Sequence, residues 1–326
     1  MHFWAAVLAF AILMYVLLDG FDLGVGMLFG LNGDSGQRDR MMRTIAPVWD
    51  GNETWLVVIG TVLFGAFPSV YAIFLSAFYL PVALLLGALI LRGVSMEFRG
   101  RSRGLRWLWN AGFSGGSAAA AFVQGAAVGA LVEGIRVGDG QFTGGPWDWL
   151  SPFAVVCGLG LVAGYALLGA SWLVTKTRDD LRDWSYGWML RLLGISLVFI
   201  GVAFCWTLLA RLNITDRWFR EPLLLAVPSL VLAGGAIGTF WSWRARLDRL
   251  AYPMTALIFL AAFSAFLLSF WPWILPGDLR FSEAAAPPKS LEFLFYGAGM
   301  VVLPIVIIYT ISVYWIFRGK SRPLGE

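Results

Sequence analysis

The 326-residue chain is 59% hydrophobic and only 13% charged, and its mean hydropathy is +0.75. Soluble domains carry about 25% charged residues, so too few polar side chains remain here to cover a surface exposed to water. The composition therefore excludes a soluble protein and indicates an all-α polytopic membrane protein with a single membrane domain. The net charge of +4 comes from arginines dispersed over short loops, which argues against nucleic-acid binding.

Nine apolar segments are long enough to cross a bilayer core of ~30 Å as helices. The first begins at Phe3 without a basic region or a cleavage site before it, so we interpret it as a retained helix and not as a signal peptide. Residues 53–91 are too many for one crossing, and Pro68 disfavours helix at Phe67, so we expect a hairpin that turns there. The expected helices span residues 3–31, 51–67, 70–91, 111–135, 151–175, 189–210, 222–243, 251–272 and 291–317.

The basic residues predict the orientation of the chain. Most of the 24 Lys and Arg residues fall in the loops after the first, third, fifth and seventh expected helices and in the C-terminal tail. Loops rich in Lys and Arg remain in the cytoplasm, so the N-terminus is expected outside and the C-terminus in the cytoplasm, which requires an odd number of crossings. The first two of these loops contribute Arg38, Arg40, Arg43, Arg92, Arg99, Arg101, Arg103 and Arg106.

Five carboxylates are expected at the cytoplasmic ends of the first three helices. Asp19 and Asp22 lie on a similar face near the end of the first helix, Asp50 and Glu53 stand at the start of the second, and Glu97 ends the third. Ionisable groups at membrane depth usually face the bundle interior or water, and they often belong to proton or ion routes. The pattern therefore predicts a proton or ion site at this end.

Local structure offers alternative interpretations of the same carboxylates. Asp50 precedes an expected helix start, so it would suit an N-cap, with Glu53 as the back-reaching member of a capping box. Asp19 and Asp22 would suit ion pairs with the arginines of the following loop, of which Arg38 is the first. These structural roles are compatible with proton handling, so both interpretations stay open at this stage.

Two further features predict helix packing. Glycines recur in overlapping small-xxx-small steps, which allow helices to approach closely. These glycines are Gly20, Gly24, Gly26 and Gly30. Gln124, midway along the fourth expected helix, is expected to hydrogen-bond a neighbouring helix.

The supply of ligands limits metal chemistry. The one histidine, His2, lies at the outer end of the first helix, and Cys157 and Cys205 are isolated, with no haem-attachment motif. Haem iron is usually held by His, Cys, Met or Tyr, so a bis-histidine haem site within the chain is excluded. We expect that this chain by itself binds no metal and no haem.

Several motifs resemble the second subunit of cytochrome bd-type quinol oxidases, over essentially the whole chain. The most specific are the Asp-Gly-Phe-Asp helix that begins at Asp19 and the Trp-Asp-Gly-Asn sequence that begins at Trp49 and opens the next helix. Glu53, which follows the second motif, is replaced by another residue in some members. The other matches are Phe64–Pro68, Tyr71-Ala72, Phe78-Tyr79, Leu91–Gly93 and Glu97–Arg99, while the C-terminal half matches mainly in hydropathy and loop lengths.

This resemblance implies a subunit of a terminal oxidase in a bacterial cytoplasmic membrane. The complex would oxidise ubiquinol or menaquinol near the outer face and reduce O2 to water. Its two b-type haems and one d-type haem would all belong to the larger subunit I, so the chain alone would not be catalytic. The family also implies two four-helix bundles plus one peripheral helix, a structural quinone in some members, and a small single-helix accessory subunit in others.

The resemblance also implies roles for individual residues. Asp50 would belong to a route for cytoplasmic protons at the subunit interface, with Asp19, Asp22 and Glu53 as expected contributors. Trp55 would border an apolar path for O2. We expect Trp49 beside it at the same interface.

The competing hypothesis is a secondary transporter. The Asp19–Asp22 segment would interrupt the first helix, as in transporters that hold ions at broken helices. Transporters of that kind often carry a second broken helix in a matching repeat, and no matching acidic break occurs in the fifth to ninth expected helices.

Overall fold

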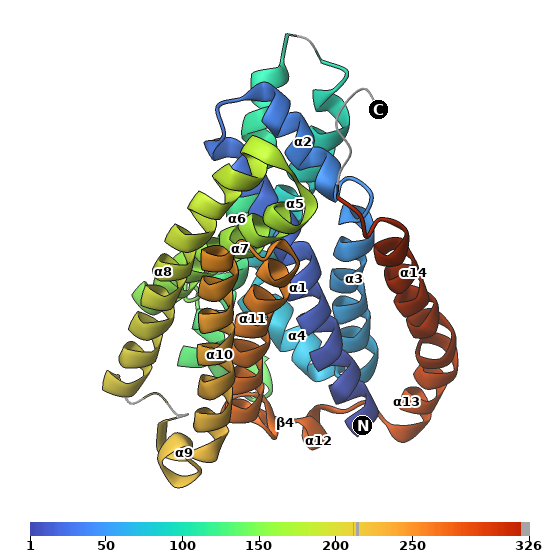
Figure 1. The fold of residues 1–326 in the computed structure, drawn as a ribbon. Coiled ribbons are helices and arrows are strands. Elements are labelled where there is room, and N and C mark those ends of the chain that lie inside the picture. Colours follow the sequence, from blue (N-terminus) through green and yellow to red (C-terminus); the bar gives the residue numbers. More distant parts are fainter. Residues whose placement is uncertain (103, 211, 213–214, 321–326) are drawn as a thin grey trace.

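The structure, a computed structural model, describes residues 1–102, 104–210, 212 and 215–320 (Figure 1). Arg103, one of the arginines used to orient the chain, lies outside these residues. Helices dominate the described part. They are α1 (His2–Leu31), α2 (Ser35–Ile45), α3 (Trp49–Ala66), α4 (Pro68–Ala77), α5 (Tyr79–Arg99), α6 (Arg106–Glu133), α7 (Pro152–Lys176), α8 (Asp179–Leu209), α9 (Thr215–Arg220), α10 (Leu223–Ala245), α11 (Asp248–Phe270), α12 (Phe281–Ala284), α13 (Pro288–Leu294), the π-helical η1 (Phe295–Val302) and α14 (Leu303–Ile316).

Two short antiparallel hairpins connect helices at one end of the bundle. One joins β1 (Val137–Gly138) to β2 (Gln141–Phe142), and the other joins β3 (Trp273–Leu275) to β4 (Leu279–Arg280). Each strand has only two or three residues, and the hairpins serve as connections between helices, although Leu275 of β3 is buried in an apolar cluster with residues of α1, α3 and α4.

Helix α1 lies at the centre of the molecule and packs against α3, α6 and α7 (Figure 1). Helix α7 also contacts α8 and α11, and α10 pairs with α11. The last helix, α14, lies at the periphery and contacts α3. Helix α7 contacts α1 and α6 as well as α8 and α11, so these contacts do not separate the molecule into two bundles. The division into two four-helix bundles therefore stays a prediction.

Glycines allow α1 to approach both of its main neighbours, as the sequence predicts. A Cβ atom at Gly24 would lie 1.8 Å from the carbonyl oxygen of Tyr165 in α7. On the α6 side, a Cβ atom at Gly26 would lie 2.1 Å from Oγ of Ser117, and Gly30 is equally crowded by Ser114. The predicted packing role of these glycines is confirmed.

The prediction of residues 70–91 as one continuous helix is wrong. The turn at Pro68 is where the sequence places it, but the chain breaks again at Phe78, between α4 and α5. Pro81 explains the second break, because proline has no N–H to continue the ladder and its ring clashes with the carbonyl four residues earlier. It is tolerated in the first turn of a new helix, where the N–H would lack a partner anyway.

Several helix boundaries extend beyond the apolar segments. Helix α8 begins at Asp179, about three turns before the expected residue 189, because its polar first turns are still helical outside the apolar stretch. Helix α2 forms within the expected first loop, where Asp34 caps it by accepting a hydrogen bond from the Gln37 N–H at 2.6 Å. The expected helix 291–317 is also present, with the π-helical η1 inserted between α13 and α14.

Eight helical segments in the described part of the chain are long and apolar enough to cross a membrane. Helix α3 is not one of them, although it has 18 residues, because Asp50, Asn52 and Glu53 in its first turns lower its hydropathy. Nine crossings, with α3 as the ninth, therefore stay a prediction. Helix α1 runs without a break from His2 to Leu31, so the interrupted first helix on which the transporter hypothesis rests is wrong.

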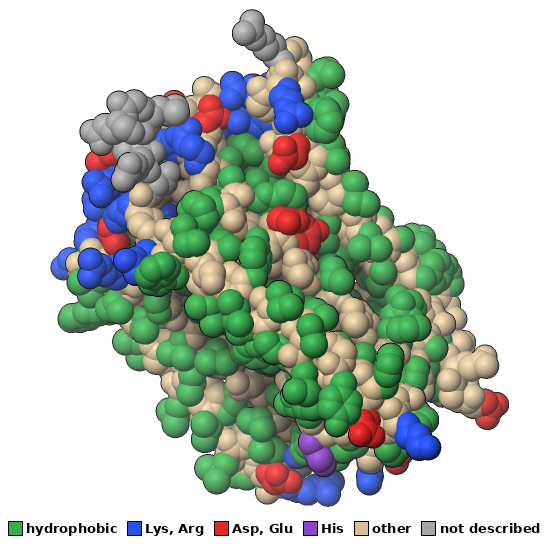
Figure 2. All heavy atoms as spheres, turned by 90° about the vertical axis from the view of Figure 1, so that its right-hand side faces the viewer, with side chains coloured by type: hydrophobic (Ala, Val, Ile, Leu, Met, Phe, Trp, Pro, Cys, Tyr) green, Lys and Arg blue, Asp and Glu red, His purple; other side chains and the backbone are tan. Residues whose placement is uncertain are grey.

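The basic loops meet at one end of the bundle, as predicted. Arg40 of α2 donates to the carbonyl of Arg178, in the α7–α8 connection, at 2.9 Å. Lys176 at the end of α7 donates to the carbonyl of Phe317, just after α14, at 2.6 Å. We call this the basic end; Figure 2 shows Lys and Arg side chains concentrated there, above a tall hydrophobic surface.

Asp39 of α2 ties the basic end together. Its carboxylate accepts hydrogen bonds from Arg99 of α5 and, at 3.0 Å, from Arg106 of α6. Burial alone would raise the pKa of Asp39, but the hydrogen bonds and charges of both arginines outweigh it and hold that pKa below its usual range. This stabilisation is therefore fully present above the usual carboxyl pKa of about 3.9 and is lost as pH falls through the lower, folded-state value.

We expect Asp39→Asn to lower the melting temperature of the protein near pH 7, by an amount that shrinks as the pH falls below about 4. Thermal unfolding of the wild type and the variant across this pH range would measure it. A melting-temperature difference that stays constant down to the lowest pH would show that the Asp39 charge contributes nothing.

Candidate functional site

A buried ionic cluster joins α1 to α5 close to the basic end. Asp19, Asp22 and Arg92 are all 0% exposed. Arg92 Nη1 donates to Asp19 Oδ1 at 2.7 Å, and Arg92 Nη2 lies 3.9 Å from Asp22 Oδ2. The structure thus brings the two predicted aspartates together around one guanidinium that the sequence analysis placed in a loop.

The expected pairing of these aspartates with the following loop is wrong. Arg38 instead donates to the carbonyl of Phe29 at 3.1 Å, and Arg40 donates to the α7–α8 connection. The physical reason is depth. Asp19 and Asp22 lie inside the packed bundle, where only a side chain from a neighbouring helix reaches them, whereas α2 lies over the end of the bundle.

Asn52 extends the cluster to two more helices. Its side-chain amide donates to Asp22 Oδ2 at 2.7 Å and to the Leu18 carbonyl at 3.3 Å. Its side-chain carbonyl accepts a hydrogen bond from the Tyr314 hydroxyl at 3.0 Å. This series of side-chain contacts runs from Arg92 through Asp22 and Asn52 to Tyr314. It therefore connects α5, α1, α3 and the peripheral α14.

The cluster holds two carboxyl groups for one guanidinium. Asp19 Oδ2 and Asp22 Oδ1 are buried and have no hydrogen-bond partner among the described residues, and the same is true of Arg92 Nε and Nη2. An uncompensated buried charge is costly, so the Arg92 guanidinium favours keeping α1 and α5 at this distance. The geometry therefore suits a fixed electrostatic anchor between helices.

The other three predicted carboxylates are open to the surroundings of the chain. Asp50 and Glu97 are exposed and Glu53 is half-buried. The capping-box interpretation is wrong, because α3 begins at Trp49 and its N-cap is Val48, which makes no side-chain cap hydrogen bond. Asp50 instead lies in the first turn of α3, where the helix dipole favours a negative charge.

The two predicted tryptophans differ in exposure. Trp49 is half-buried, and the Arg92 guanidinium lies 6.0 Å from the centre of its ring. Trp55 is fully buried and meets Phe10 edge to face at 5.4 Å. Trp49 therefore covers the ionic cluster, whereas Trp55 belongs to the apolar contact between α1 and α3.

A second polar group lies deeper in the bundle and confirms the expectation for Gln124. Its amide donates to the Tyr15 hydroxyl at 3.0 Å and its carbonyl accepts from the Tyr165 hydroxyl at 3.0 Å. This side chain therefore links α6 to both α1 and α7, which satisfies its polar atoms without water or a ligand.

The described ranges hold no cluster of metal-ligating side chains. No group of three or more His, Cys, Asp or Glu side chains there could hold a metal ion. His2 is exposed at the start of α1, 6.3 Å from the Trp271 ring.

Three members of the cluster were not predicted from the sequence, namely Arg92, Asn52 and Tyr314. For Arg92 a signal exists, since Leu91-Arg-Gly93 follows an apolar run with little room for a loop, and an ionisable group at that depth needs a partner. Asn52 stands inside the Trp-Asp-Gly-Asn motif. Nothing in the sequence around Tyr314 indicates its contact, because the contact depends on where α14 packs.

Comparison with known proteins gives a consistent family. The sequence model described as cytochrome bd terminal oxidase subunit II matches residues 1–317. The chain is 27% identical to cytochrome bd-I ubiquinol oxidase subunit 2 of Escherichia coli (strain K12), over 97% of this chain and 94% of that protein. It is 28% identical to cytochrome bd ubiquinol oxidase subunit 2 of Bacillus subtilis (strain 168), over 97% and 95%.

A shorter match and a solved structure add to this. The chain is 33% identical to the probable cytochrome oxidase subunit 2 of Haemophilus influenzae, over 55% of this chain and about half (50%) of that protein. The fold is similar to a chain in the structure of bd oxidase from Geobacillus thermodenitrificans, with a TM-score of 0.72 and 17% identity, over 97% of this chain and 98% of that one. Because the family model spans nearly the whole sequence, this chain belongs to the cytochrome bd terminal oxidase subunit II family.

Proposed function

We propose that this chain is the haem-free subunit of a bd-type quinol oxidase and that it has two tasks. It holds the haem-bearing subunit I in place, and it passes protons from the cytoplasm toward the site where O2 is reduced to water. Family membership and the ubiquinol oxidase names of the relatives support the first task. The arrangement of the carboxylates supports the second.

A difference in exposure between two pairs of carboxylates supports the proton role. Asp19 and Asp22 are fully buried against Arg92, whereas Asp50 is exposed and Glu53 is half-buried one turn along the same helix. Only the second pair can exchange protons with water or with a partner. We therefore assign the relay to Asp50, with Glu53 as the next group, and an anchoring role to Asp19 and Asp22.

The position of this relay suits uptake from the cytoplasm. Asp50 is the second residue of α3, shortly after the end of α2 at the basic end, and basic loops face the cytoplasm. Figure 2 shows acidic side chains open at the surface below the basic end, on the side of the molecule where α14 lies. Protons entering here would reach a partner without crossing the apolar core of this chain.

The subunit thus contributes proton handling and the positioning of subunit I. When subunit I is bound, its haems supply the electron transfer to O2. Trp49 and Trp55 would then stand between the relay and the apolar interior, which suits an O2 path along α3. The complex would take quinol and O2 as substrates in a bacterial cytoplasmic membrane.

The relay predicts that Asp50→Asn lowers quinol oxidase turnover and proton uptake by about tenfold or more, since a positioned proton donor typically contributes 10²–10⁴-fold. The matched control is Asp180→Asn, the same change at an exposed carboxylate in the first turn of α8, which should leave turnover unchanged. Both variants should be purified as the complete complex and should show wild-type haem spectra. Unchanged turnover and proton uptake in an assembled Asp50→Asn complex would remove the relay.

A further inference from the structure

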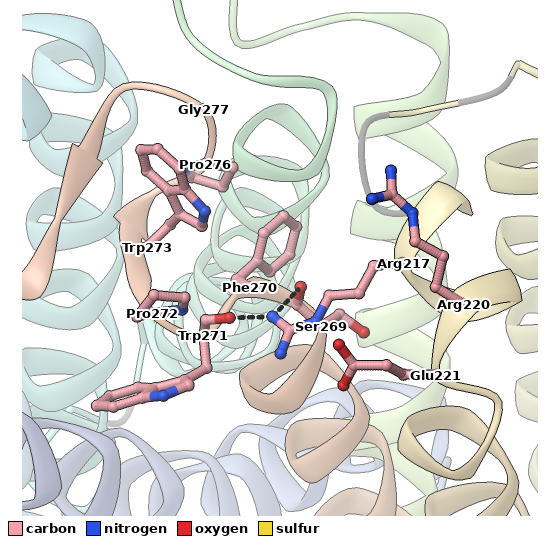
Figure 3. Close-up of a pocket in the computed structure, with 10 residues that line it drawn as sticks. All are labelled: Arg217, Arg220, Glu221, Ser269, Phe270, Trp271, Pro272, Trp273, Pro276 and Gly277. Carbon is pink, nitrogen blue, oxygen red and sulfur yellow. Dashed lines mark hydrogen bonds between the residues drawn. The ribbon is translucent and has the colours of Figure 1, made fainter.

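A pocket lies at the end of the molecule opposite the basic end, between α9 and the turn from α11 into β3 (Figures 1 and 3). Its volume is ≈ 440 Å³, within the range of about 300–1,000 Å³ found for small-molecule sites. Two arginines and a glutamate line one side, and two tryptophans line the other. These are Arg217, Arg220, Glu221, Trp271 and Trp273.

One of the two arginines is already committed to the fold. Arg217 donates to the carbonyls of Ser269 and Trp271, and Figure 3 shows its guanidinium turned toward them. The side chain of Arg220 extends away from these groups. Arg220 and Glu221 are both exposed, and neither side chain has a hydrogen-bond or ion-pair partner among the described residues. The pocket therefore offers one cation and one anion to a ligand.

Apolar side chains stand beside this charged pair. Phe219 is 78% exposed and Leu223 is 74% exposed. Their exposure does not mean that the segment is loosely held. The adjacent Trp218 donates to Ser269 Oγ at 2.8 Å and stacks on Phe204, with 5.7 Å between the ring centroids. Helix α9 and the start of α10 thus expose Phe219 and Leu223, in a chain whose surroundings are lipid.

We propose that this pocket binds the headgroup of a zwitterionic phospholipid with a primary ammonium group, of the phosphatidylethanolamine type. The phosphate would pair with Arg220 and the ammonium with Glu221, each as a charge-assisted contact. The acyl chains would lie against Phe219 and Leu223. Trp271 and Trp273 suit the depth, since tryptophan is enriched at the membrane–water interface.

The chemistry selects against other ligands. A purely anionic headgroup such as that of phosphatidylglycerol could place its phosphate against Arg220, but it has no ammonium group to pair with Glu221. A choline headgroup has no N–H to donate to that carboxylate. Free phosphoethanolamine would satisfy both charges but would gain nothing from the exposed apolar residues, so it should bind far more weakly than the intact lipid.

The test is lipid binding to the intact oxidase complex in detergent, measured by native mass spectrometry with phosphatidylethanolamine, phosphatidylglycerol or phosphatidylcholine added at equal concentration. Phosphatidylethanolamine should bind best to the wild type. Arg220→Gln should weaken it about tenfold, and Glu221→Gln should abolish its advantage over phosphatidylglycerol. The matched control is Arg136→Gln, a 76% exposed arginine in the connection after α6, outside the pocket, which should change neither quantity.

Three results would overturn the proposal. They are equal binding of the three lipids to the wild type, binding of free phosphoethanolamine as tight as that of the lipid, and a bound quinone that Arg220→Gln releases while lipid binding is unchanged. Both replaced side chains are exposed, so the variants should fold, and unchanged haem spectra of the complex would verify this.

Discussion

Replacing Arg92 with glutamine is expected to abolish stable assembly of the subunit. The change leaves Asp19 and Asp22 fully buried without the guanidinium that now lies 2.7 Å from one and 3.9 Å from the other. Removing one partner of a buried ion pair typically costs about 3–5 kcal/mol, because the remaining charge is uncompensated. That is a large part of the roughly 5–15 kcal/mol by which proteins are stable.

The amount of detergent-extracted complex and its melting temperature would measure this effect. Arg99→Gln is the matched control, since Arg99 is another α5 arginine with an ion pair, to the partly exposed Asp39, and its loss should cost less. The triple variant Arg92→Gln/Asp19→Asn/Asp22→Asn removes all three charges and should recover part of the stability. A triple variant no better than Arg92→Gln would show that hydrogen bonding and packing, and not charge, hold the cluster.

The ionic cluster shows what the sequence could and could not predict about the site. A carboxylate in an apolar helix stands out in any sequence because its burial is costly, so Asp19 and Asp22 were found. Their partner was not, because Arg92 is about 70 residues away and becomes a neighbour only when α5 packs against α6, which in turn packs against α1. Loop arginines closer in the sequence were the wrong choice for the same reason.

The helices of the fold were likewise predicted only in part. Long apolar runs predicted the major helices, because a membrane span requires continuous hydrophobicity. Polar helices gave no such signal, so α2 and the first turns of α8 were missed. The break at Phe78 could have been predicted from Pro81, but apolar residues continue through it and hid the interruption.

The two kinds of carboxylate place a structural contact and the proposed relay within one motif. Asn52 donates a hydrogen bond to Asp22 from one face of α3. Asp50 and Glu53, in the same two turns, are exposed and half-buried, respectively. Anchoring α3 to α1 through Asn52 therefore fixes the position of the proposed relay. A change at Asn52 would disturb both roles, whereas a change at Asp50 would disturb only the second.

Replacing Gly24 with alanine is expected to separate α1 from α7 and to destabilise the subunit. The new Cβ would lie 1.8 Å from the Tyr165 carbonyl oxygen and 2.8 Å from the Gly169 amide nitrogen. Both are backbone atoms, so no side-chain rotation relieves the clash and the helices must move apart. Overpacking of a core typically costs about 1–3 kcal/mol, and the backbone contact places this substitution at or above the upper end.

The matched control is Gly194→Ala in the middle of α8, where a Cβ would meet nothing within 4 Å. Alanine favours helix over glycine by about 1 kcal/mol, so this variant should be at least as stable as the wild type. The two glycines thus predict opposite signs for the same chemical change, measured as melting temperatures of the purified complex. A Gly24→Ala protein as stable as Gly194→Ala would mean that α1 and α7 are not in close backbone contact. The buried cluster that depends on the position of α1 would then need a different geometry.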